Sequence, residues 1–250
     1  MNSDFPQARA AVEKFPIWVN ELAATLPAPV LIKVGGRTRW EHESKTPLEL
    51  QVAKAVRLAT SLRAALALAD LRLTTEASSL LRMIGDINGE IGLLAEALVA
   101  GRLTKEQQDF LDQNFSYLPS TPEQLAAREP VRIVGRGTVA KARARLFRAP
   151  KAAVEEDARR VAYLHSGHDG YVHAKYSTAM ELFNGRYFML VGSESEAQVR
   201  SAKIAVAGKT VESVQSLRLM AKIRGLDKLR DDLRAAEVAV MKEHEEAVES

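Results

Sequence analysis

The 250-residue chain contains no cysteine, which excludes disulfide bonds, thiolate metal sites and a cysteine nucleophile. Histidine is scarce, with five residues, and aromatic residues make up only 6% of the chain. No apolar run approaches the roughly 20 residues of a membrane-spanning helix, because charged residues interrupt the longest one, around 62–73. The first residues lack the basic and then apolar pattern of a secretory signal. We therefore expect a cytoplasmic protein that has no membrane partner.

The charges are segregated along the chain, although hydrophobic residues at 46% and charged residues at 27% are typical of a folded globular protein. Residues 131–154 contain no acidic residue, whereas residues 237–250 are rich in glutamate. The basic stretch is either a solvated face or a phosphate-binding surface for RNA. Its candidate nucleic-acid-binding residues are Arg132, Arg136, Lys141, Arg143, Arg145 and Arg148, followed by Lys151.

Helix signals dominate the sequence from residue 47 onward. Thr46 precedes Pro47, and Glu49 follows three positions after Thr46, which predicts a capping box at the start of a helix that reaches about residue 73. A second helix is predicted from residue 75 to residue 100 because Gly101 is a suitable C-terminal cap. A third helix, which is short, should begin after Thr104 with another capping box. Further helices are expected near residues 138, 153 and 172.

The first 46 residues differ in pattern from the rest. They predict a helix over about 7–26 and a strand over 30–34, which two glycines end. That strand could form a small hairpin with residues 37–40. We therefore predict an N-terminal accessory segment over 1–46 and a helical bundle domain over 47–250, in which residues 116–151 are loop-rich and basic.

The C-terminal stretch 211–248 predicts one long helix. Within it, Leu219, Leu226, Leu233 and Val240 recur every seven residues. Such a stripe packs within the bundle or against a partner, which is either a second copy of the chain or another protein. The predicted fold class is mainly α: a multi-helix bundle with a long C-terminal helix and a small N-terminal accessory segment.

Three of the five histidines, His165, His168 and His173, lie within nine positions. If residues 162–183 are helical, they share the buried side with Asp169 and Tyr176. Buried polar groups need partners or a chemical role, so three interpretations are open. In the first, His165 and His173 are buried and only hydrogen-bond to Asp169. In the second, His165, Asp169 and His173 bind the divalent metal ion of a hydrolase, together with acidic residues from elsewhere in the chain. In the third, a histidine performs acid–base chemistry on RNA.

A second polar group lies in the helix predicted over 75–100. Arg82, Asp86 and Glu90 follow one another at intervals of four residues, with isoleucines on the opposite side. They form either an exposed ladder of ion pairs or a support for the histidines. In the second case Asp86 or Glu90 orients an imidazole or completes a metal site, and Arg82 holds a phosphate. Three glycines within 85–92 favour this alternative, because glycine in a helix permits close approach of a backbone or ligand.

The segment from Arg160 to His165 resembles the motif of the HEPN (higher eukaryotes and prokaryotes nucleotide-binding) superfamily, an arginine and a histidine separated by four to six residues. Arg159 with His165 fits the same pattern at a longer spacing. Members of that superfamily are helical bundles, often dimeric, and frequently metal-independent endoribonucleases of defence and toxin systems.

The resemblance implies an RNA-cleaving enzyme without a metal cofactor. In such an enzyme His165 would be the general base or acid, Arg160 would stabilise the phosphate, and His168 or His173 would assist. The run from Ser166 to His173 is also similar to segments of uncharacterised bacterial helical proteins.

Overall fold

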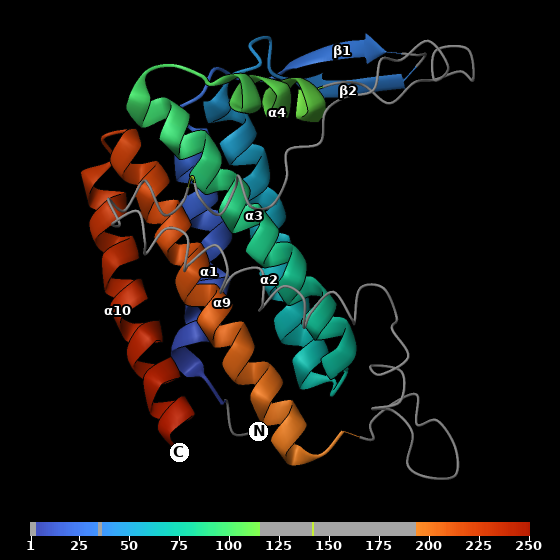
Figure 1. The fold of residues 1–250 in the computed structure, drawn as a ribbon, viewed down its shortest axis with the longest axis vertical. Helices are drawn as coiled ribbons and strands as arrows, with labels where there is room; N and C mark the ends of the chain where they lie inside the picture. Colours follow the sequence, from blue (N-terminus) through green and yellow to red (C-terminus); the bar gives the residue numbers. More distant parts are fainter. Residues whose placement is uncertain (1–3, 35–36, 116–141, 143–193) are drawn as a thin grey trace.

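The structure is a computed structural model that describes residues 4–34, 37–115, 142 and 194–250. In these ranges the chain forms six helices and one two-stranded sheet, so the predicted mainly α fold is confirmed (Figure 1). The elements are α1 (Pro6–Ala23), β1 (Val30–Val34), β2 (Arg37–Glu41), α2 (Pro47–Asp70), α3 (Thr74–Ala100), α4 (Lys105–Phe115), α9 (Glu196–Ile223) and α10 (Asp227–Glu249).

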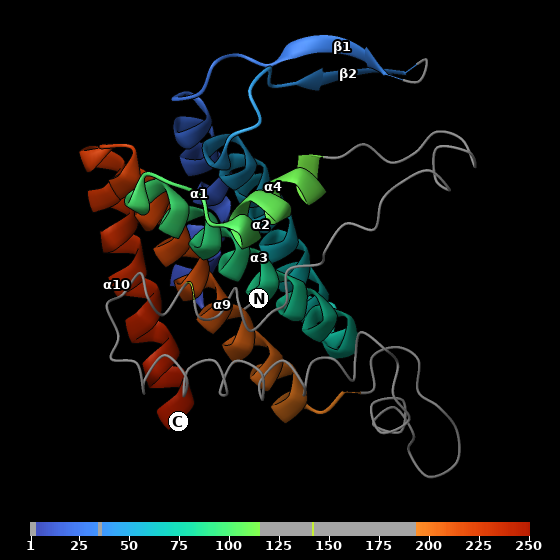
Figure 2. The same ribbon diagram turned by 45° about the horizontal axis from the view of Figure 1, so that its top comes forward.

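Five of these helices, α1, α2, α3, α9 and α10, lie side by side around one core, and α4 crosses one end of the bundle (Figures 1 and 2). α9 begins at the end of the bundle where α2 turns into α3, so α3 and α9 run parallel. The pairs α2–α3 and α9–α10 are antiparallel helical hairpins joined by three-residue turns. None of the described helices is both long and apolar enough to span a membrane.

Local capping interactions set the helix starts that the sequence predicted. The Glu49 carboxylate accepts a hydrogen bond from the Thr46 amide at 2.8 Å, which closes the capping box of α2. The Thr104 amide donates to Gln107 Oε1 at 2.9 Å, and the Gln107 amide donates back to Thr104 Oγ1 at 3.3 Å. At the end of α3, Gly101 adopts the left-handed conformation with φ of 65°.

The predicted N-terminal hairpin is present, and α1 belongs to the main core. β1 and β2 pair antiparallel, from Val30 opposite Glu41 to Val34 opposite Arg37. On α1, Phe15 and Leu22 are fully buried in the same apolar cluster as residues of α2, α3, α9 and α10. The hairpin projects beyond the end of this core (Figure 2).

The prediction of one long helix over 211–248 needs correction. α9 already begins at Glu196, and the chain reverses at residues 224–226 before α10. Gly225 has a φ of 68°, and the Leu226 amide donates to the Ala221 carbonyl at 3.0 Å, as in a Schellman C-cap. Leu233 and Val240 are fully buried, so the α10 part of the heptad stripe packs inside the chain. The heptad repeat does not require a continuous helix, because two successive bundle helices each need an apolar face and can together give the same spacing.

A smaller apolar cluster lies where α4 crosses α2 and α3. Its members are Leu50, Leu93, Leu94, Phe110, Leu111 and Ala142. Ala142 is the one described residue of the basic stretch, and it is fully buried here. Ala142 therefore packs beside α3 and α4.

We expect Leu217→Ala to lower the free energy of unfolding by about 2–5 kcal/mol, because Leu217 is fully buried on α9 and its truncation leaves a cavity. Urea denaturation followed by circular dichroism measures this change. Val56→Ala removes methyl groups from a half-exposed position on α2 and should change stability by less than about 0.5 kcal/mol. Equal effects of the two variants would contradict this account of the core.

Candidate functional site

Most residues of the predicted site lie outside the described residues. The histidine segment is among them: Arg160, His165, His168, Asp169, His173 and Tyr176. The basic residues Arg132, Arg136, Lys141, Arg143, Arg145 and Arg148 are outside as well. The catalytic, metal-binding and nucleic-acid-binding roles given to them therefore stay predictions. Of the predicted site, the structure describes the three polar residues of α3.

These three residues do not form a continuous exposed ladder. Arg82 is only 4% exposed, and its guanidinium pairs with the Asp86 carboxylate one turn further along α3. Glu90 pairs instead with Lys54 of α2, at 2.7 Å. The Lys54 ammonium also lies 5.5 Å from the centroid of the Phe110 ring on α4, within the range of a cation–π contact. Tertiary packing thus separates the three residues. Arg82 and Asp86 pair within α3, whereas Glu90 belongs to a set of contacts that joins α2, α3 and α4.

The buried Arg82 is the most unusual member of this group, because guanidinium groups are rarely taken out of water without a partner. Asp86 supplies that partner, and its own side chain stays one-third exposed. Both predicted acids, Asp86 and Glu90, therefore face a cation. In the described part of the chain, no group of three or more histidine, aspartate or glutamate side chains is arranged to bind a metal ion.

A buried hydrogen-bond cluster joins α3 to α9, and the sequence patterns did not reveal it. Asn88 Nδ2 donates to Ser213 Oγ at 3.0 Å, and Ser216 Oγ donates to Asn88 Oδ1 at 2.8 Å. Ser213 Oγ also donates to the Lys209 carbonyl at 2.7 Å. Because both polar ends of Asn88 are satisfied, this cluster fixes the relative position of the two helices. The available signal was an asparagine among the isoleucines of α3.

Arg224, directly after α9, ties the end of this helix to α2. Its guanidinium donates to the Leu48 carbonyl at 3.0 Å and to Gln51 Oε1 at 3.2 Å. Gln51 Nε2 in turn donates to the Ile91 carbonyl of α3 at 3.1 Å. Burial lowers the pKa of Arg224 to about 10. These partners are neutral, so hydrogen bonds rather than an ion pair stabilise the half-buried guanidinium.

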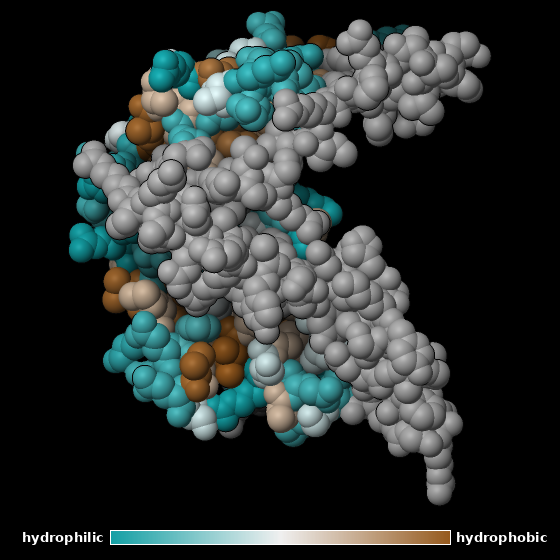
Figure 3. All heavy atoms as spheres, in the orientation of Figure 1, coloured by the Kyte–Doolittle hydropathy of each residue, from teal (hydrophilic) through white to brown (hydrophobic). Residues whose placement is uncertain are grey.

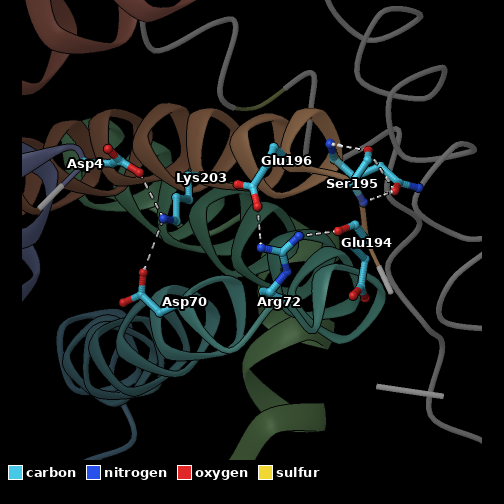
Figure 4. Close-up of polar contacts among 8 residues, drawn as sticks. Asp4, Asp70, Arg72, Glu194, Ser195, Glu196 and Lys203 are labelled. Atoms are coloured by element: carbon cyan, nitrogen blue, oxygen red, sulfur yellow. Dashed lines mark hydrogen bonds and ion pairs between the residues drawn. The ribbon is translucent and has the colours of Figure 1, made fainter. Parts of the chain in front are cut away.

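The opposite end of the bundle carries a network of ion pairs (Figure 4). The Arg9 guanidinium binds both carboxylate oxygens of Asp70, at 2.7 and 2.5 Å. Lys203 on α9 lies 3.8 Å from the same carboxylate and 3.0 Å from Asp4. The hydrogen bond from Arg9, its charge and that of Lys203 hold the pKa of Asp70 below its ordinary value, although burial opposes this. The network joins α1, α2 and α9.

A separate set of contacts beside this network holds Arg72 against the start of α9. This arginine pairs with Glu196 at 2.6 Å and donates to the Glu194 backbone carbonyl. Arg72 has a φ of 63°, in the left-handed region where glycine is usual and other residues cost roughly 1–2 kcal/mol. The equivalent turn after α9 has a glycine at this position, Gly225. An arginine is tolerated after α2 because its side chain holds the beginning of α9.

α9 begins with a capping box that the sequence analysis missed. The Gln198 amide donates to Ser195 Oγ at 3.2 Å, and the Ser195 amide donates to Gln198 Oε1 at 2.8 Å (Figure 4). The pattern of serine followed three residues later by glutamine was a readable signal for a helix start. Together with Arg72, it fixes the first turn of α9.

Comparisons of the chain with protein-family models, with curated proteins and with solved structures find no significant match. The functional argument therefore depends on the residues of this chain.

We expect Asp70→Asn to lower stability at pH 7 by up to about 1 kcal/mol, a small change because the pair is partly exposed. The pKa of Asp70 is lower in the folded protein than its ordinary value of 3.8. Its contribution to folding stability is therefore fully present above pH 3.8 and is lost as the pH falls through the folded-state pKa. Urea titrations from pH 7 to pH 3 should show the difference from wild type shrinking toward zero. Asp232→Asn, at an exposed position of α10, is the control. A difference that persists undiminished at pH 3 would contradict the role of the Arg9–Asp70 pair.

Proposed function

We propose that the chain is a metal-independent, RNA-cleaving enzyme similar to the HEPN superfamily, with a role in bacterial defence. The observation that carries the proposal is the Arg160-to-His165 motif. A mainly α bundle in the described residues agrees with the fold that this resemblance implies. The chemistry belongs to the segment between α4 and α9.

In the proposed reaction, His165 takes the proton of a ribose 2′-hydroxyl, and the oxygen attacks the adjacent phosphorus. Arg160 neutralises the charge that develops on the phosphate in the transition state. The 5′-oxygen leaves with a proton supplied by His168 or His173. The products are a 2′,3′-cyclic phosphate and a free 5′-hydroxyl.

One feature of the described residues supports the metal-independent form. Using Asp86 and Glu90 as metal ligands would require breaking their ion pairs with Arg82 and Lys54. In the proposal, the basic residues that flank the buried Ala142 in the sequence, Lys141 and Arg143 among them, contribute sequence-independent attraction for the RNA phosphates.

We expect purified wild-type protein to cleave a labelled mixed-sequence RNA in EDTA, and His165→Ala to lose at least about 100-fold of the rate, the contribution typical of a general base or acid. Gel electrophoresis of the products, with detection of cyclic phosphate ends, measures both. Arg160→Ala and Arg159→Ala assayed in parallel identify which arginine acts with His165.

The matched control is His42→Ala, which removes a histidine after the hairpin and outside the motif. It should cleave like wild type, and a contaminating nuclease would act equally in all preparations. Equal cleavage by wild type and His165→Ala would refute the proposal. Cleavage that depends on His165 and is abolished by EDTA would instead favour a metal-dependent hydrolase.

A second candidate function is a helical interaction module that binds a copy of itself through α10. The observation that favours it is a set of exposed apolar side chains on the α10 side away from the core: Val238 at 55%, Met241 at 38% and Val248 at 61% exposure. Their spacing places them on one side of the helix. Figure 3 shows apolar side chains at the surface where α10 lies.

The double variant Val238→Glu/Met241→Glu should abolish self-association through α10, because two charges would be buried at the interface. Light scattering after size exclusion, over a range of protein concentrations, measures the mass. Ile17→Glu, at an exposed apolar position of α1, is the control. A wild-type chain that stays monomeric, or an unaltered dimer in the double variant, would remove this candidate. Point variants are needed because deleting residues 211–250 would also remove core residues such as Leu217 and Leu233.

A further inference from the structure

One face of the β1–β2 hairpin exposes a tryptophan and a leucine that lie directly opposite each other. Leu31 pairs with Trp40 across the strands, and their side chains are 57% and 69% exposed. The next pair on the same face is Lys33 opposite Thr38, and both are exposed. The face therefore presents an aromatic ring, an aliphatic side chain and a cation in adjacent positions.

The core of the protein does not account for this tryptophan. The hairpin projects from the end of the bundle, and its two strands pair mainly with each other (Figures 1 and 2). The only other tryptophan, Trp18, is 4% exposed and packs edge-on against Phe15 in the core. Single exposed apolar residues are common, but a tryptophan and a leucine paired on a projecting hairpin are typical of a binding surface.

The charges of the hairpin indicate the kind of partner. Residues 30–41 contain three basic residues, Lys33, Arg37 and Arg39, and one acidic residue, Glu41. Lys33 is exposed and forms no ion pair within the described part of the chain. An exposed aromatic ring beside an unpaired cation is the combination that binds single-stranded nucleic acid, in which bases stack on the ring and cations contact phosphates.

We infer that the β1–β2 hairpin binds single-stranded RNA, with an unpaired base stacked on Trp40, in contact with Leu31, and a neighbouring phosphate at Lys33. The choice of RNA as the nucleic acid rests on the proposed RNA-cleaving function. A single strand is required because the base faces of a duplex are not accessible to a side chain. The hairpin is separate in sequence from the predicted catalytic segment, so it recognises the substrate and leaves the chemistry to residues 160–173.

The test is binding of a short labelled oligouridine in which every ribose carries a 2′-O-methyl group. Such a strand lacks the nucleophile of the proposed reaction and stays intact, so binding is measured independently of cleavage. Fluorescence anisotropy of the full chain should give a Kd that rises roughly 5- to 150-fold in Trp40→Ala, equivalent to the ~1–3 kcal/mol of one stacked base. Trp40→Phe keeps an aromatic face and should retain most of the affinity.

Two further measurements separate stacking from general charge attraction. Lys33→Gln should reduce the slope of log Kd against log salt concentration by about 0.7, the value for one phosphate contact on a single strand. Lys242→Gln on α10, which removes an exposed lysine far along the chain, should leave the slope unchanged. Oligouridine should also quench the fluorescence of wild-type protein but not of Trp40→Phe, in which only the buried Trp18 remains.

The inference is overturned if Trp40→Ala binds oligouridine like wild type, or if it loses as much affinity for heparin, which has no bases. It is also overturned if the variant changes the oligomeric state and not RNA affinity, since the hairpin would then be a protein interface. Binding through Trp40 without His165-dependent cleavage would keep this inference and refute the proposed enzyme. Cleavage that depends on His165 while Trp40 is dispensable for binding would do the reverse.

Discussion

The burial of α9 against α1, α2, α3 and α10 is the interaction on which the rest of the structure depends. Val206, Val214, Leu217 and Met220 are almost completely removed from water, and three of the four helices around α9, namely α1, α2 and α3, are distant from it in sequence. Apolar burial is the largest favourable term in folding, but it is not directional. The direction comes from the polar cluster around Asn88, which is satisfied in one alignment of α3 and α9. Core and polar cluster together select one arrangement.

Both ends of α9 are fixed by contacts with the α2–α3 hairpin. At its start, Arg72 holds Glu194 and Glu196, and at its end Arg224 reaches Leu48 and Gln51. The first contact requires an unfavourable backbone conformation at Arg72, and the second keeps the Arg224 guanidinium partly out of water. Backbone strain and desolvation of this kind persist only where the surrounding packing and hydrogen bonds compensate for them. α9 therefore behaves as a helix held in length and register by the hairpin beside it.

This arrangement gives the bundle a defined part in the proposed function. α4 ends at one end of the bundle and α9 begins at the other, so the chain that joins them leaves and rejoins the bundle at separated points. Buried Ala142 adds a third attachment, beside α4. In the proposed function, the hairpin at the α4 end would bind the strand, and residues between α4 and α9 in the sequence would carry the chemistry. The bundle itself would contribute position rather than chemistry.

Much of the fold follows from local signals. The capping boxes of α2 and α4, the glycine cap of α3 and the glycines between the two strands predict where elements begin and end, because these interactions involve residues only a few positions apart. The break at Gly225 was missed since the heptad of leucines continues across it and indicates only which side of each helix is apolar. The start of α9 does have a local signal in the sequence, the capping box of Ser195 and Gln198.

The sequence by itself determined the mainly α fold, the helix starts and the hairpin, since near neighbours in the chain decide these. It also supplied the motif on which the proposed chemistry rests, but not the surroundings of that motif. Only the tertiary structure decided that Arg82 is buried, that Glu90 pairs with Lys54 rather than along its own helix, and that Trp40 is exposed while Trp18 is not. The physical reason is that burial and ion-pair partners depend on which helices become neighbours, and α9, more than 90 residues after α3, completes that neighbourhood.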